Sequence, residues 1–416
     1  MQLKTILNLV QPQPGFVYES VRLIEGPRRE IEIEVRPRKN HRPCCSVCGR
    51  SGPGYDTQAE RRFEFVPLWG MAVFLVYALR RVKCAQCGVR VERVPWGSGK
   101  RQLTDTYAWF LASWAKRLSW TEVAETFHTS WEKVYRAVEL AVEWGRAHQS
   151  LAGIEAIGVD EIQWQRGHRY LTLVYQIDAG CRRLLWIGPE RKEETLLGFF
   201  HWFGAERSAA LRFICSDMWR PYLKVIAQKA AQAVHVLDRF HLMKILSKAI
   251  DDVRAEEVKA LKAAGHDPVL THARWLLLKR PENLTEKQEP RLAELLTYNL
   301  RSVRAYLLKE DFQSFWAYRS PHWAGQFLDR WCTRTLRSRL DPMKKVARTL
   351  RSHRPLILNW FRAKGAISSA AVEGFNNKAK LTMRKAYGFR TDKAMEIALY
   401  HTLGALPEPV MTHRFC

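Results

Sequence analysis

Residues 153–188 have the sequence GIEAIGVDEIQWQRGHRYLTLVYQIDAGCRRLLWIG, and the spacing of their apolar side chains decides the fold of the central part of the chain. Between Tyr170 and Asp178 every second side chain is apolar, which is the period of a strand with one buried face. Similar signals over 154–164 and 183–188 flank it. The stretch therefore predicts three adjacent strands in an antiparallel meander.

Downstream of the meander, helical and strand signals alternate. The expected elements are a helix over 193–203, a buried strand over 211–216, a helix over 221–231, a strand over 233–237 and a helix over 239–254. Three strands followed by alternating helices and strands is the element order of a ribonuclease H-like domain, an α/β fold. The sequence thus predicts such a core over residues 151–254.

The pattern changes again after this core. Residues 255–361 lack strand alternation and contain amphipathic stretches such as 292–307 and 316–340. We interpret them as an all-helical insertion. The core is then expected to resume over 362–400, and 401–416 to form a C-terminal tail.

Two aspartates stand where the predicted core strands would bring them together. Asp160 lies within the first strand, in GVDE (158–161), and Asp217 directly follows the fourth, in CSDM (215–218). If these strands are neighbours, the two carboxylates emerge close to each other. Carboxylates held close repel unless cations lie between them, which is the condition for binding Mg²⁺ or Mn²⁺ through hard oxygen ligands.

A third carboxylate, Glu373, stands in SSAAVEGFNNK (368–378), where capping serines precede a predicted helix. Helical spacing places four polar side chains on one stripe: Glu373, Asn377, Lys380 and Arg384. The opposite side has four apolar ones: Val372, Phe375, Ala379 and Met383. A carboxylate on a cationic stripe suits a metal site beside a phosphate backbone. Asn377, Lys380 and Arg384 are then the expected DNA contacts. The alternative is that Glu373 only favours the positive end of its helix.

Cysteine spacing defines an N-terminal segment. Five of the nine cysteines fall within the first hundred residues, and four of them form two C-x-x-C pairs: Cys45 with Cys48 and Cys84 with Cys87. Four thiolates complete a tetrahedron that favours Zn²⁺. Strand signals lie between the pairs, so residues 39–100 are predicted to form a zinc ribbon, after a separate segment over 1–38. Two alternatives stay open: reduced structural thiols, and Cys44 in place of Cys45.

A helical region follows over 101–150. The stretch SWTEVAETFH (119–128) begins with a capping residue, a break follows at 129–130, and a second helix begins near Trp131. Two helices joined by a tight turn suit a helix-turn-helix that binds the major groove, with Lys133 and Arg136 free to contact DNA. The alternative is a helical hairpin that serves only as a linker.

The charge of the chain agrees with a nucleic-acid partner. With 67 Lys and Arg against 42 Asp and Glu, the net charge is +25 over 416 residues. The sequence lacks an apolar span of about twenty residues and a signal-peptide pattern, and its cysteines do not form an evenly distributed disulfide framework. We expect a cytoplasmic, nucleoid-associated protein with no membrane partner.

These motifs together resemble the bacterial insertion-sequence transposases of the DDE class, in the branch with an N-terminal zinc-binding domain. The resemblance covers most of the chain. It rests on the two C-x-x-C pairs, called the paired knuckles below, on the helix-turn-helix and on six further motifs: GVDE (158–161), GHRY (167–170), SDM (216–218), DRFH (238–241), RWLLLK (274–279) and VEGFNNK (372–378). It implies a multidomain α/β protein whose ribonuclease H-like catalytic core is interrupted by an all-helical insertion. It also implies Asp160, Asp217 and Glu373 as the catalytic, metal-binding triad.

The segment DRFH resembles an Asp-x-x-His signature of this branch and of Mutator-like relatives. Asp238 and His241 would orient a metal ligand or contact substrate, because a histidine one helical turn beyond an aspartate can share its hydrogen bond. The alternative is a local cap pair. Asp238 is not counted as a member of the triad.

The resemblance implies that the N-terminal modules bind terminal inverted repeats while the core hydrolyses phosphodiesters and transfers strands. The implied cofactors are Mg²⁺ or Mn²⁺ in the core and Zn²⁺ in the ribbon, and the partner is double-stranded DNA of the repeats and the target. Two ends imply a homodimer or higher oligomer. Two other classes stay open: a catalytically silent DNA-binding regulator and a nuclease without strand transfer.

Overall fold

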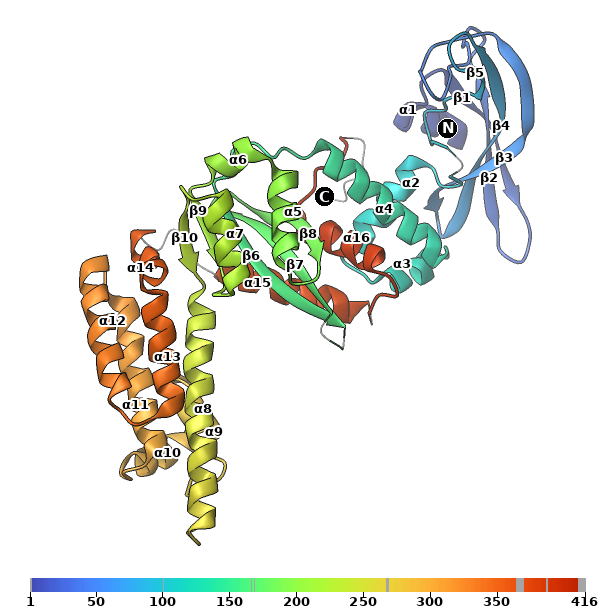
Figure 1. Cartoon of the computed structure of the whole chain (residues 1–416). Coiled ribbons are helices and arrows are strands. Elements are labelled where there is room, and N and C mark those ends of the chain that lie inside the picture. The colour runs from blue at the N-terminus through green and yellow to red at the C-terminus, as the bar shows by residue number, and fades with distance from the viewer. Residues whose placement is uncertain are drawn as a thin grey trace. The chain divides into compact units, whose positions relative to one another are not determined.

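The structure is a computed structural model that divides into two compact units, Met1–Ser150 with Leu381–Cys416 and Leu151–Lys380 (Figure 1). It describes residues 2–99, 101–165, 167, 169–266, 269–363, 370–386 and 388–410. His168 of the GHRY motif and the capping serines Ser368 and Ser369 lie outside the described residues. Within the described part, no helix is long and apolar enough to cross a membrane.

The first unit begins with a helix and a five-stranded sheet. Its elements are α1 (Leu3–Val10), β1 (Phe16–Ile24), β2 (Glu30–Pro37), β3 (Gly54–Leu68), β4 (Met71–Cys84) and β5 (Gly88–Val91). The strand order is β1-β2-β4-β3, with β5 paired to β4. Residues 1–38 are therefore not a separate segment, because the alternating apolar residues of β2 are buried in the core that this sheet shares with β3 and β4.

Helices complete the first unit: α2 (Asp105–Ala115), α3 (Trp120–Thr126), α4 (Trp131–His148) and α16 (Asp392–Leu403). The predicted pair of helices with a break between them is confirmed. Ser119 and Glu122 form a capping box at the start of α3, and Ser130 caps α4. Helix α16 packs on α4, where Lys393 Nζ lies 2.6 Å from Glu139 Oε1.

The placement of α16 corrects two expected boundaries. Residues 392–400 were expected in the resumed core and 401–416 in a tail, but Asp392–Leu403 is one helix of the first unit. Its apolar residues, including Met395, Ile397 and Leu399, are buried there. Helical periodicity shows that such a face must be covered, but it does not show which part of the chain covers it.

The second unit contains the predicted meander. Its strands are β6 (Ala156–Gln165), β7 (Arg169–Asp178), β8 (Cys181–Pro189), β9 (Phe213–Ser216) and β10 (Val234–Leu237). The order is β10-β9-β6-β7-β8, in which β6, β7 and β8 pair antiparallel whereas β9 and β10 run parallel to β6. The antiparallel meander is confirmed. The two later strands therefore lie next to the first one.

Helices cover both faces of this sheet (Figure 1). On one face α5 (Glu193–Phe203) and α7 (Arg220–Lys229) form a core with Val159 and Val174, and the short α6 (Ala205–Ala210) follows α5. On the other, α15 (Ala370–Lys385) lies so close that a Cβ at Gly158 would stand 2.3 Å from Val372 Cγ2. Alternation along β6 therefore directs Gly158 and Asp160 toward α15.

The expected helical insertion is present. Helix α8 (Arg239–Ala263) continues from the sheet into it, so the helix expected to end at 254 is longer. The others are α9 (Arg274–Leu278), α10 (Gln288–Leu296), α11 (Arg301–Gln313), α12 (Pro321–Leu336), α13 (Asp341–Ser352) and α14 (Arg354–Arg362), with 3₁₀ turns at Pro281–Asn283 and Ser314–Ala317. They share one apolar core that includes Leu246, Phe312 and Trp331.

Candidate active site and metal centre

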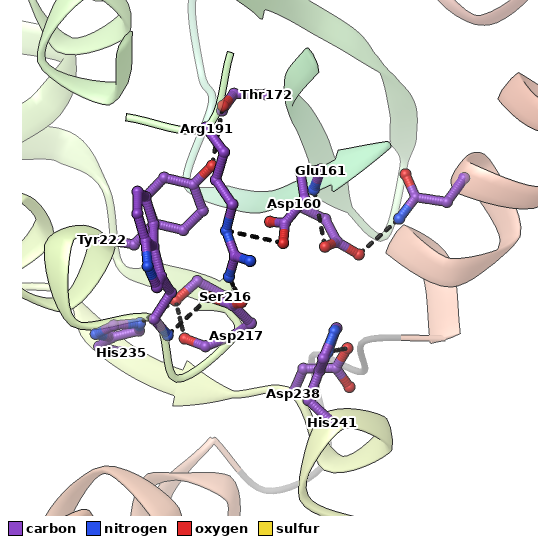
Figure 2. Close-up of polar contacts among 12 residues, drawn as sticks. Asp160, Glu161, Thr172, Arg191, Ser216, Asp217, Tyr222, His235, Asp238 and His241 are labelled. Carbon is purple, nitrogen blue, oxygen red and sulfur yellow. Dashed lines mark hydrogen bonds and ion pairs between the residues drawn. The ribbon is translucent and has the colours of Figure 1, made fainter. Parts of the chain in front are cut away.

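Three aspartates from three neighbouring strands face a common space (Figure 2). Asp160 lies in β6, Asp217 directly follows β9, and Asp238 directly follows β10. Their exposed fractions are 9%, 6% and 6%. The strands are adjacent and parallel, so their carboxyl ends lie along the same edge of the sheet. The expectation that the strands of Asp160 and Asp217 are neighbours is confirmed.

The charges at this edge favour a cation. Burial raises the pKa of the Asp160 carboxyl, and the charges of Asp238 and Asp217 raise it further, whereas the backbone N–H of Glu161 and the His241 ring oppose the rise. The Glu161 N–H donates to Asp160 Oδ1 at 2.8 Å. Carboxylates gathered in this way are hard oxygen donors, so their chemistry fits Mg²⁺ or Mn²⁺.

Arg191, which was not predicted from the sequence, binds Asp217. Arg191 Nη2 lies 2.7 Å from Asp217 Oδ2, and Arg191 Nε lies 3.0 Å from Glu161 Oε1. The guanidinium stands 4.6 Å from the centroid of the Trp219 ring. Burial, with the Asp217 charge, raises the pKa of Glu161 to about 7. No sequence signal marks Arg191, because it stands in a connection between β8 and α5 that has no recognisable motif.

Asp238 and His241 form the pair that their spacing suggests. Asp238 caps α8: its Oδ1 accepts a hydrogen bond from the Phe240 N–H at 2.7 Å, and its Oδ2 lies 2.8 Å from His241 Nδ1. That hydrogen bond raises the pKa of His241. The geometry of a local cap pair is therefore present. Asp238 also belongs to the acidic edge, because its charge helps to raise the pKa of Asp160.

Helix α15 packs beside this site through Val372 and Asn376, and it carries Glu373. Glu373 is exposed and makes no hydrogen bond or ion pair with the described residues. The predicted polar stripe is otherwise present, since Asn377, Lys380 and Arg384 are exposed while Val372 and Ala379 are buried. One turn after Glu373, the buried Asn376 donates from Nδ2 to Asp160 Oδ2 at 2.6 Å. The role of Asn376 was not predicted from the sequence, because it depends on a contact across 216 residues.

The four cysteines of the paired knuckles converge. The sulfurs of Cys45, Cys48, Cys84 and Cys87 all lie within 4.8 Å of one another, and in the described part of the chain no cluster of three or more carboxylates or histidines does the same. Cys44 lies outside the cluster, and its Sγ lies 3.7 Å from the Arg42 carbonyl oxygen. The structure therefore selects Cys45 over Cys44 as a candidate ligand.

Backbone geometry supports a metal at these sulfurs. Gly49 and Gly88 follow the two knuckles with φ of 71° and 73°, which lets the chain fold back so that amides face the sulfurs. The backbone N–H groups of Cys87 and Gln86 lower the pKa of the Cys84 thiol to about 7. Burial and the neighbouring sulfurs raise the pKa of Cys87 to about 12. Four crowded sulfurs cannot all be thiolates without a cation, so the donor set fits a structural metal.

The two basic residues expected to be free on α4 are ion-paired. Lys133 Nζ lies 2.5 Å from Glu64 Oε2, and Arg136 Nη1 lies 2.9 Å from Glu139 Oε2. Glu139 is one helical turn from Arg136 and β3 supplies Glu64, so the two side chains are not unpaired, and their contact with DNA stays a prediction. Their side chains remain 35% and 58% exposed.

Comparison with known proteins gives one consistent answer. A family model described as a transposase, of the ISL3 group of DDE enzymes, matches residues 157–399. The transposase for insertion sequence element IS1001 of Bordetella parapertussis is 30% identical over 379 residues, which are 90% of this chain and 92% of that protein. The transposase for insertion sequence element IS1557 of Mycobacterium tuberculosis is 32% identical over 400 residues, 89% and 88% of the two chains.

Proposed function

Because the chain belongs to the ISL3 family of insertion-sequence transposases and is a DDE-type DNA transposase, we propose that Asp160, Asp217 and Glu373 are its catalytic triad. The observation that supports this assignment best is the meeting of Asp160 and Asp217 at one edge of the sheet, with Glu373 on the helix that packs beside Asp160. The triad comes from segments on both sides of the helical insertion.

The proposed core is a ribonuclease H-like domain. Its support is the strand order, an antiparallel meander followed by two strands parallel to the first. The pair Asp238 and His241 is proposed as the counterpart of the Asp-x-x-His signature of Mutator-like relatives. It would orient a residue that binds the metal, or contact the DNA substrate. The capped helices α3 and α4 are proposed as a helix-turn-helix.

In the proposed mechanism, Asp160, Asp217 and Glu373 hold Mg²⁺ or Mn²⁺ against a phosphodiester. A divalent ion held there would supply Lewis-acid chemistry, polarising the phosphoryl oxygens and lowering the pKa of the attacking water or 3′-hydroxyl. The chain's own residues position these ligands: the Trp219 N–H donates to Asp217 Oδ1 at 2.9 Å and the Glu161 N–H donates to Asp160 Oδ1. Lys380 and Arg384 then contact the DNA backbone.

The N-terminal modules are proposed to bind the terminal inverted repeats. Cys45, Cys48, Cys84 and Cys87 hold Zn²⁺ and stabilise the end of the sheet where β4 pairs with β5. Two element ends need two catalytic cores, so the active form is a homodimer or a higher oligomer. Association with the nucleoid follows from DNA binding.

Cleavage of DNA that contains an element end tests the triad. With Mg²⁺, the purified protein should cut at the end and join the freed 3′-hydroxyl to target DNA. Asp217→Asn removes one charged ligand and should bind the same DNA while losing several orders of magnitude in cutting rate. Asp252→Asn, at an exposed position of α8, is the matched control and should cut normally.

Three other results would contradict the proposed function or its metal site. Full cutting by Asp217→Asn would refute the metal assignment. Binding by the wild-type protein without cutting would favour a regulator, and cutting without joining would favour a nuclease.

A further inference from the structure

We propose that Asn376 is a positioning residue, which fixes one oxygen of Asp160 and thereby sets where Glu373 stands. The inference rests on the proposed function, in which Asp160 and Glu373 hold the same metal ions. Asn376 is 6% exposed and lies on the inner side of α15. It joins two segments that are 216 residues apart in the chain.

The chemistry of its neighbours determines the orientation of the Asn376 amide. Nδ2 donates to Asp160 Oδ2 at 2.6 Å, and Oδ1 accepts from the Tyr175 hydroxyl at 2.8 Å. An ionised carboxylate only accepts hydrogen bonds, so the amide nitrogen must face Asp160. The Tyr175 hydroxyl then satisfies the remaining oxygen and prevents the amide from turning over.

The hydrogen bonds leave Asp160 able to bind a metal. Its Oδ1 accepts from the Glu161 N–H and its Oδ2 accepts from Asn376. Each carboxylate oxygen has two lone pairs, so one on each oxygen stays available to a cation. The carboxylate is thus held in one orientation before any metal arrives, which is the condition for a preorganised ligand.

Two further contacts fix the register of α15 on the sheet. Gly158 has no side chain where Val372 packs, and a Cβ there would lie 2.3 Å from Val372 Cγ2. The Phe375 ring stacks on Tyr175, with centroids 4.9 Å apart and planes 14° from parallel. A slip of α15 by one residue would break both contacts and the Asn376 bond together. Because Glu373 precedes Asn376 by three residues, almost one helical turn, the same register determines its position.

A purely structural role for Asn376 makes a different prediction. As the buried partner of Tyr175, its loss would lower stability but leave metal binding unchanged in the protein that stays folded. A positioning role requires weaker metal binding as well. Metal affinity without DNA therefore separates the two roles.

The test is Mn²⁺ binding to the full-length protein, measured by calorimetry without DNA, together with the Mn²⁺ dependence of cutting. Asn376→Ala should weaken Mn²⁺ binding about 10- to 100-fold, as expected for loss of a group that orients a ligand. Tyr175→Phe keeps the ring stack and removes only the hydroxyl, so it should weaken binding about 2- to 10-fold. Asn299→Ala, at an exposed asparagine of the insertion, should bind Mn²⁺ like the wild type.

Asp160→Asn, measured in parallel, separates the two hypotheses. If Asp160→Asn binds Mn²⁺ and cuts DNA normally, the proposed function itself is wrong. If it loses both while folded Asn376→Ala and Tyr175→Phe bind Mn²⁺ like the wild type, only the positioning role is overturned. Should Asn376→Ala fail to fold, Tyr175→Phe decides alone.

Discussion

Arg191 places a positive charge at the carboxylate that the proposed mechanism assigns to a metal. Its guanidinium contacts both Asp217 and Glu161, and the ring of Trp219 lies beside it. In the absence of metal this contact offsets part of the repulsion among the buried acids. A metal ion that binds Asp217 therefore competes with Arg191 for the same oxygen.

Arg191→Ala should make the protein more dependent on divalent metal for its stability. In EDTA, the free energy of unfolding should fall by about 1–3 kcal/mol, because two partly buried carboxylates lose their partner. Mn²⁺ should then raise the melting temperature more in this variant than in the wild type, since the ion replaces the missing charge. Arg182→Ala, at an exposed arginine of β8, is the control for loss of charge. Equal Mn²⁺ shifts in Arg191→Ala and wild type would contradict the competition.

The sequence predicted some of these residues and missed others for a physical reason. Asp160 and Asp217 were found because strand patterns place one within and one directly after a predicted core strand, and these strands are adjacent and parallel in the structure. Arg191 and Asn376 were missed because their roles depend on contacts across 26 and 216 residues. Glu373 was chosen by family resemblance among many helical glutamates, and its role as a ligand stays a prediction.

At the scale of elements, local signals predicted what each segment forms better than where it packs. A serine cap predicted α3, helical spacing predicted α4, and period-two alternation predicted the β6-β7-β8 meander. The same signals did not place β1, β2 or α16, because an apolar face does not specify which surface will cover it. Tertiary contacts across long stretches of chain decide those placements.

The doubled cysteine of the first knuckle permits a sharp test of the zinc site. Cys45→Ser removes one of four converging sulfurs, whereas Cys44→Ser changes the adjacent residue outside the cluster. The first variant should lose its bound zinc and unfold the N-terminal sheet at lower temperature, because a structural zinc site contributes folding energy. The second should retain one zinc ion per chain. Elemental analysis measures the zinc content and thermal unfolding measures the stability of each variant. Loss of zinc from Cys44→Ser but not from Cys45→Ser would show that Cys44 is the ligand instead.

At the scale of the whole molecule, the excess positive charge indicates that electrostatic attraction contributes to DNA binding, but it does not show which residues contact the phosphates. The net charge is +25, yet Lys133 and Arg136 are partly neutralised by acidic neighbours. The stripe of α15 is different, since Lys380 and Arg384 are exposed beside Glu373 on the helix that packs against Asp160. Phosphate contacts should therefore concentrate on this stripe rather than spread evenly over all basic residues.

The salt dependence of DNA binding tests that distribution. Each phosphate contact releases counterions, so the logarithm of the association constant should fall linearly with the logarithm of salt concentration, by about 0.9 per contact. Lys380→Ala and Arg384→Ala should each reduce the slope by about one contact. Lys262→Ala, which removes an exposed lysine of α8, is the matched control and should leave the slope unchanged. Equal slopes for all three variants would mean that the stripe does not contact the DNA backbone, and that attraction arises from the net charge as a whole.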